Sequence, residues 1–282
     1  MLPYIAEFLG TAILIILGDG VVANVTLEKS AMKNAGTTQI CIAWGLAVLI
    51  PAFIFGTASG ASFNPALTLA LAVDGSFSWS MVPGYIVAQM SGAFVGAVCV
   101  YILYKDQFDA TENPKVKLCV FSTSPAVPNW GRNLFSEAMG TFLLVFAIKG
   151  IGNVPNIAGG IDKLLVFGII VSVGMSLGGL TGYAINPARD IGPRTAFAPF
   201  ITDLANATGA VALQAGEMIS NSSIDAPVFT YAISQVFDII NGNWIPLVVL
   251  VVWGVCYVFY YRELKKENQQ AEAETVQNNL GE

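Results

Sequence analysis

The chain of 282 residues contains no histidine, only four cysteines and few charged side chains. Without histidine it cannot form a Ser–His or Cys–His catalytic pair, nor a histidine proton relay. The cysteines form no Cys-x-x-Cys pair, so no metal site is expected among Cys41, Cys99, Cys119 and Cys256. We therefore expect no enzyme activity, no cofactor and no metal. With 13 Lys and Arg against 19 Asp and Glu, the chain also lacks the basic surface that binds nucleic acid.

The shortage of charge also excludes an ordinary soluble domain. Charged residues make up 11% of the chain and hydrophobic residues 55%, whereas about a quarter of a soluble domain is charged. Such a composition predicts an all-α membrane protein with several spans. The start, MLPYIAEFLG, has no basic segment and carries Glu7 early, which argues against a cleaved signal peptide.

Six apolar runs are long enough to cross a bilayer core of about 30 Å. They lie at about 4–25, 40–57, 81–104, 133–151, 162–179 and 244–261. Two shorter apolar runs, 64–73 and 186–197, would reach only about 15–18 Å as helices, so we expect re-entrant half-helices. Polar loops are expected at 26–39, 105–132 and 199–243. The membrane domain covers 1–262, and a polar tail, 263–282, follows.

The two halves of the chain resemble each other. IAEFLGTAILIILG (5–18) matches FSEAMGTFLLVFAI (135–148), with Glu7 and Glu137 in register, and GASFNPAL (60–67) matches GYAINPAR (182–189). Each unit, about 4–104 and 133–262, contains three spans and one half-helix. An odd number of spans requires the second unit to be inverted in the membrane, and inverted repeats build a transport site between them.

The two Asn-Pro-Ala boxes have a direct physical meaning. Asparagine is a strong N-cap and proline suits the first helical position, so each box begins a half-helix. Two such N-termini meeting at the membrane centre would each act as roughly +0.5 charge and repel cations. The asparagine amides remain to donate hydrogen bonds to a neutral solute. The predicted central constriction comprises Asn64, Pro65, Ala66, Asn186, Pro187 and Ala188.

These paired boxes, the glutamates of spans one and four and the sequence NPARDIGPR (186–194) resemble the major intrinsic protein (aquaporin) family. Asp190 and the long outer loops resemble its glycerol-facilitator branch, the aquaglyceroporins. The resemblance implies six transmembrane helices, two half-helices and a homotetramer with one pore per subunit. It also implies a multi-pass protein of the cell membrane, in contact with lipids, with both termini in the cytoplasm. The distribution of basic residues does not itself support that orientation.

In that family a second constriction selects the solute, and motif alignment places it at Trp44, Gly174, Tyr183 and Arg189. Water-selective relatives have a histidine at the Gly174 position, and here glycine is expected to leave room for a carbon chain. Arg189 would donate to hydroxyl groups, and Trp44 with Tyr183 would form an apolar wall.

Simpler interpretations stay open for two of these residues. Trp44 is also compatible with an interfacial aromatic belt, and Gly174 with small-residue helix packing.

Some positions depart from the glycerol facilitators. Tyr183 stands where they have phenylalanine, and Ser62 where they have histidine. We expect the Tyr183 hydroxyl to point away from the solute, toward water or a loop. Asp19 is unusual in a first span, and we expect it at a water-facing end.

Glu7 and Glu137 are expected to accept hydrogen bonds from the backbone that leads into the half-helices, because that backbone needs partners. The expected function is a passive channel for glycerol and other small neutral solutes, with some water, that excludes ions and protons. Alternatives are a proton-coupled secondary transporter, in which these acids would be relays, or a channel for lactic acid or urea.

Overall fold

The computed structural model describes residues 1–127, 129–194 and 196, which are helical with connecting loops and contain no strand. Five of its helices are long and apolar enough to cross a membrane. They are α1 (Leu2–Thr26), α2 (Thr37–Ser59), α4 (Val82–Leu103), α7 (Trp130–Gly152) and α8 (Ile161–Thr181). They confirm the five predicted spans that fall in these ranges, and the sixth, 244–261, lies outside them.

Two shorter helices begin at the Asn-Pro-Ala boxes. Helix α3 (Pro65–Val73) has 9 residues, so its length is about 14 Å, half of a bilayer core. A second helix starts at residue 187 and continues to residue 194 in the described part of the chain. Both are the half-helices that the sequence predicts.

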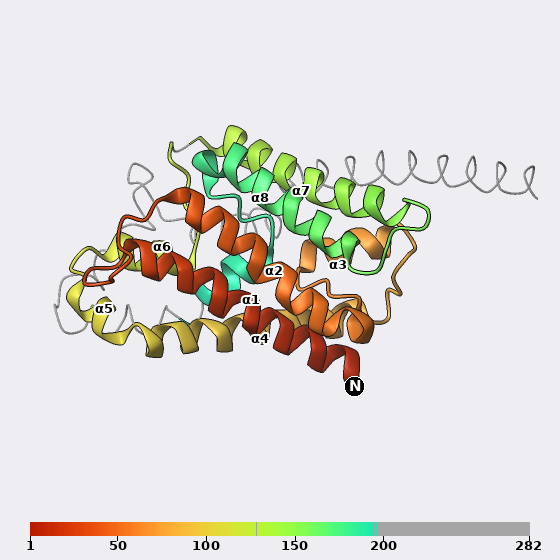
Figure 1. Cartoon of the computed structure of the whole chain (residues 1–282), viewed down its shortest axis with the longest axis horizontal. Coiled ribbons are helices and arrows are strands. Elements are labelled where there is room, and N and C mark those ends of the chain that lie inside the picture. Colours follow the sequence, from red (N-terminus) through yellow and green to blue (C-terminus); the bar gives the residue numbers. More distant parts are fainter. Residues whose placement is uncertain (128, 195, 197–282) are drawn as a thin grey trace, which may run out of the picture.

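The spans form an arc that α3 closes. Helix α1 packs against both α2 and α4, α2 packs against α8, and α8 packs against α7. Helix α3 contacts α4 at one end of this series and α7 at the other. Figure 1 shows α7 and α8 side by side, with α2 between this pair and α1. A half-helix therefore lies between the two ends of an arc of full spans.

Glycines allow α1 and α4 to touch through their backbones. A Cβ atom at Gly92 would lie 2.2 Å from the carbonyl oxygen of Phe8, and one at Gly96 would lie 2.7 Å from that of Ala12. No larger side chain fits at such distances. Close approach at small residues is the usual way in which membrane helices pack, since lipid supplies no hydrophobic drive.

The predicted polar loop at 105–132 is wrong in part, because it contains helices α5 (Lys105–Ala110) and α6 (Pro114–Phe121). The Asn113 side chain accepts a hydrogen bond of 2.9 Å from the Lys115 amide, and Pro114 occupies the first turn. Phe108 and Phe121 are buried and stack with ring centroids 5.4 Å apart. This aromatic pair anchors both short helices to the core.

The expectation that Asp19 lies at a water-facing end is also wrong. Its side chain is 0% exposed, and it lies seven residues before the end of α1. The reason is the position of α1, which packs between α2 and α4 and also contacts α6. Burial of this helix therefore extends almost to its end.

Candidate functional site

The loops that precede the two half-helices share one backbone geometry. Helices α2 and α8 each end at a glycine in the left-handed region, Gly60 and Gly182. In each loop the residues three and one before the asparagine also have positive φ, which costs energy for any residue other than glycine. Their φ values are 55° for Ala61, 47° for Phe63, 42° for Tyr183 and 42° for Ile185.

Glu7 on α1 holds the first of these loops. Its carboxylate accepts hydrogen bonds from the backbone amides of Ser62 (3.0 Å) and Phe63 (2.7 Å). It also accepts from the Ser59 hydroxyl (2.6 Å) and from Nε2 of Gln89 (2.8 Å). The side chain is 0% exposed, so these four donors take the place of water around a buried acid.

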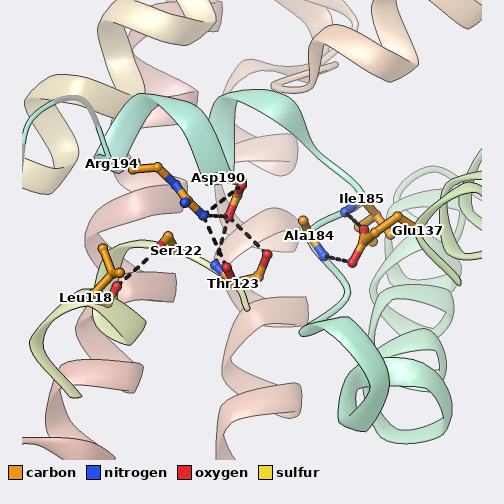
Figure 2. A network of polar contacts seen from close by, with 8 residues as sticks. All are labelled: Leu118, Ser122, Thr123, Glu137, Ala184, Ile185, Asp190 and Arg194. Carbon is orange, nitrogen blue, oxygen red and sulfur yellow. Dashed lines mark hydrogen bonds and ion pairs between the residues drawn. The ribbon is translucent and has the colours of Figure 1, made fainter. Parts of the chain in front are cut away.

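Glu137 on α7 has the same relation to the second loop. It accepts hydrogen bonds from the backbone amides of Ala184 (3.1 Å) and Ile185 (3.0 Å), as Figure 2 shows. These residues lie two and one before Asn186, and the residues bound by Glu7 lie two and one before Asn64. Equivalent acids thus hold equivalent amides in the two halves of the chain.

Both asparagines cap their half-helices. Oδ1 of Asn64 accepts from the amides of Ala66 (2.9 Å) and Leu67 (3.4 Å). Oδ1 of Asn186 accepts from the amides of Ala188 (3.0 Å) and Arg189 (3.3 Å). The prolines at 65 and 187 occupy the first helical positions, where no N–H is needed.

The amide groups of the same two asparagines cross between the loops. Nδ2 of Asn64 donates to the carbonyl oxygen of Ile185 (2.9 Å), and Nδ2 of Asn186 donates to that of Phe63 (2.8 Å). The N-termini of the half-helices therefore face each other. Because an amide NH₂ has two hydrogens, one remains on each asparagine after this bond. Sequence reasoning assigned the whole amide to a passing solute and did not predict the reciprocal bonds.

A cavity of about 280 Å³ passes this junction. Its lining includes Asp162 and Lys163 in the first turn of α8, and Tyr183 beyond the last. The Tyr183 ring packs against Gly174 and Gly178 of α8, so the cavity follows α8 from Asp162 to about the level of Gly174. At 1.5 Å per residue this is about 18 Å, more than half of a bilayer core. Both asparagines line it, and most other lining residues are apolar, among them Leu14, Val48, Leu67, Leu144, Ile148 and Ile170.

Three of the four predicted filter residues meet at one part of this cavity. Trp44, Tyr183 and Arg189 line it. The Arg189 guanidinium carbon lies 4.4 Å from the centroid of the Trp44 ring, which is the geometry of a cation–π contact. Trp44 is only 4% exposed, so its ring belongs to the interior wall.

Gly174 is not in the lining. A Cβ atom there would lie 2.9 Å from Cζ of Tyr183 and 3.1 Å from the Cys41 sulfur. The missing side chain thus makes room for the Tyr183 ring rather than for a solute. The Tyr183 hydroxyl is buried, has no oxygen or nitrogen partner among the described residues, and interacts with the Cys41 thiol. It points away from the cavity, but toward α2 and not toward water or a loop.

A buried ion pair holds the second half-helix to the segment after α6. Asp190 accepts hydrogen bonds from the backbone amide (2.8 Å) and hydroxyl (3.0 Å) of Thr123. Arg194 donates to the Thr123 carbonyl oxygen (3.1 Å) and to Asp190 (3.3 Å). Figure 2 shows the three side chains converging. Sequence reasoning missed this group, although an acid and an arginine four residues apart on a helix were a usable signal.

Comparisons with known proteins identify the family of this chain. The family model described as "Major intrinsic protein" matches residues 2–261. The chain is 54% identical over 198 residues to a probable glycerol uptake facilitator protein of Thermotoga maritima, covering 70% of this chain and 84% of the relative. It is 48% identical over 198 residues to the glycerol uptake facilitator protein of Bacillus subtilis, with coverages of 70% and 72%.

Among solved structures, the aquaglyceroporin from Plasmodium falciparum matches with a TM-score of 0.68 and 28% identity. The match covers 92% of this chain and 94% of that one.

The carboxylate contacts generate a prediction on stability. In Glu7→Gln, an NH₂ group must face one of the loop amides that now donate to the acid, so a buried N–H loses its acceptor. We expect a loss of about 1–3 kcal/mol in unfolding free energy, and smaller losses for Glu137→Gln, which loses fewer contacts. The measurement is thermal unfolding in detergent.

Glu112→Gln is the matched control, because Glu112 is exposed on the segment between α5 and α6. It should leave the unfolding temperature unchanged. Equal stability of the Glu7 variant and this control would show that the carboxylate does not hold the loop.

Proposed function

The chain belongs to the major intrinsic protein family, and from this premise we propose that it is a passive channel for glycerol and other small neutral solutes, with water alongside. The observation that carries the proposal is the cavity that follows α8 from Asp162 to about the level of Gly174 and is lined by the asparagines of both Asn-Pro-Ala boxes. Its polar groups lie at few positions, and the rest of its wall is apolar. Such a wall suits a solute with hydroxyl groups on one side and carbon on the other.

In this proposal the filter consists of Trp44, Tyr183 and Arg189. Gly174 lies behind the Tyr183 ring and leaves room for it. Arg189 donates hydrogen bonds to solute hydroxyls, which must replace water as the solute enters. The faces of Trp44 and Tyr183 contact the carbon chain. At the central constriction the remaining amide hydrogens of Asn64 and Asn186 take over the donor role.

Three observations favour glycerol and a passive mechanism. Relatives at 48–54% identity are named as glycerol uptake facilitators, and the solved relative is an aquaglyceroporin. Glu7 and Glu137 are engaged by backbone amides, so they serve as acceptors rather than as proton relays. Asp162, the described acid that lines the cavity, pairs with Lys163 at 2.9 Å.

We further propose a homotetramer in the cell membrane, with a pore in each subunit and both termini in the cytoplasm. Large apolar side chains are exposed on the spans, such as Phe53, Ile54, Val87, Leu165 and Met175. They suit contact with lipid and with neighbouring subunits. The channel domain covers 1–262, in line with a family match that ends at residue 261, and 263–282 form a tail.

The decisive test is solute flux into proteoliposomes that contain the purified protein. Glycerol influx, followed by stopped-flow light scattering, should rise linearly with the gradient and should not change when ionophores collapse proton and sodium gradients. Parallel runs with urea and protonated lactic acid rank the solutes. Glycerol influx that stops when the proton gradient is collapsed would establish a coupled transporter instead.

Tyr183 provides a test of the filter. Its hydroxyl is buried against Cys41 and does not face the cavity, so Tyr183→Phe should change glycerol permeability by less than about threefold, under ~1 kcal/mol in barrier. Tyr183→Ala removes the apolar wall and should admit bulkier polyols. The measurement is the ratio of glycerol to water permeability per channel. A tenfold loss of glycerol flux in the Phe variant would make the hydroxyl a solute ligand.

The facing half-helix N-termini predict exclusion of protons and cations. The unmodified protein should show no proton leak in proteoliposomes under an imposed potential. In the double variant Asn64→Asp with Asn186→Asp, two carboxylates offset the positive potential and the cross-loop bonds are lost, so cation leak should appear. A substantial proton leak through the unmodified protein would refute this mechanism of exclusion.

A further inference from the structure

Four charged side chains are buried near the filter. Arg189, Asp190 and Arg194 lie on the second half-helix and are 7%, 6% and 3% exposed, and Asp19 on α1 is 0% exposed. The half-helix alone carries one net positive charge in this group, and Asp19 brings the sum to zero. Because isolated charges are costly to bury, groups of this kind are normally balanced.

Two of the four are paired directly, and the other two are left. Asp190 and Arg194 form an ion pair of 3.3 Å. Within the described ranges both oxygens of Asp19 and Nη1 of Arg189 are buried without a hydrogen-bond partner. One buried anion and one buried cation thus remain, each without a direct partner in this part of the chain.

The same tryptophan connects Asp19 and Arg189. Arg189 stacks on the Trp44 ring at 4.4 Å. Gly18, next to Asp19 on α1, lies against the six-membered part of the same side chain, since a Cβ atom there would be 2.3 Å from Cζ3 of Trp44. Asp19 and Arg189 are within electrostatic range of each other but too far apart for an ion pair. Trp44 Nε1 is a further buried donor without a partner in the described residues.

We propose that Asp19 is the counter-charge of Arg189, joined to it through buried water behind Trp44, and that it positions the filter arginine. This inference rests on the proposed function, because Arg189 is a filter residue only if the chain conducts solute. Water is the ligand that this chemistry favours, since a buried water bridges polar groups too far apart to bond directly and usually makes about three hydrogen bonds. Asp19 supplies the acceptors, and Arg189 supplies a donor.

The negative charge of Asp19 also has a consequence for selectivity. Arg189 and two half-helix N-termini make the channel interior positive, which repels cations but attracts anions. A carboxylate held in the wall lowers that positive potential without entering the cavity, whose lining does not include Asp19. Asp19 thereby favours neutral solutes over small anions.

A thermal double-mutant cycle tests the pairing. Asp19→Asn and Arg189→Gln should each lower the unfolding temperature, because each leaves one charge unbalanced. The double variant should be more stable than the sum of the two losses by about 3 °C or more. In an Arg189→Lys background, which keeps the charge, Asp19→Asn should cost as much as in the unmodified protein. Additive losses would overturn the proposal.

Asp106→Asn is the matched control, since Asp106 is an exposed aspartate on α5. Its effect should be additive with Arg189→Gln. Coupling as strong as that of Asp19 would show that total charge, and not the proposed bridge, causes the effect.

Flux measurements test the positioning role. In Asp19→Asn, glycerol permeability should fall about fivefold relative to water permeability, and chloride leak should become measurable. Asp19→Glu should restore part of the glycerol flux. An unchanged glycerol-to-water ratio with no chloride leak would overturn the role of Asp19. Failure of the unmodified protein to conduct glycerol would instead refute the proposed function, because the thermal cycle needs no solute.

Discussion

Two hydrogen bonds organise the centre of this protein. Each Asn-Pro-Ala asparagine donates one of them to the loop of the opposite half. A helix that begins inside a membrane leaves backbone groups that lipid cannot satisfy. Here the loop carbonyls of Phe63 and Ile185 accept from Asn186 and Asn64, and the loop amides donate to Glu7 and Glu137. Each loop therefore depends on an asparagine from the other half of the chain and on a glutamate from a membrane span. The strained φ values of both loops persist because these contacts determine them.

Much of this arrangement could be predicted from local rules. Asparagine followed by proline specifies a helix start wherever it occurs, and the lengths of the apolar runs separate full spans from half-helices. The register of Glu7 with Glu137 pairs each acid with one loop, because the same spacing recurs in both halves. These features depend on residues close in sequence or on an internal repeat, so they can be predicted from a single amino-acid sequence.

Other features depend on packing between distant segments, which a local sequence pattern does not show. Asp19 is charged and near the end of a span, yet α1 is covered on several sides there. Gly174 matches a filter position by alignment, but the larger Tyr183 occupies its space. Helices α5 and α6 have polar faces, and it is the contact between Phe108 and Phe121 that anchors them. None of these outcomes follows from the local pattern alone.

The contact of Tyr183 with Gly174 and Cys41 means that the width of the proposed filter is set by three residues from three segments. The Tyr183 ring touches the cavity, and Gly174 and Cys41 lie behind this ring. A change of volume at Cys41 would move the ring without placing any new atom in the cavity. Solute preference in such a channel can therefore drift through substitutions in helix packing while every residue that faces the solute stays the same.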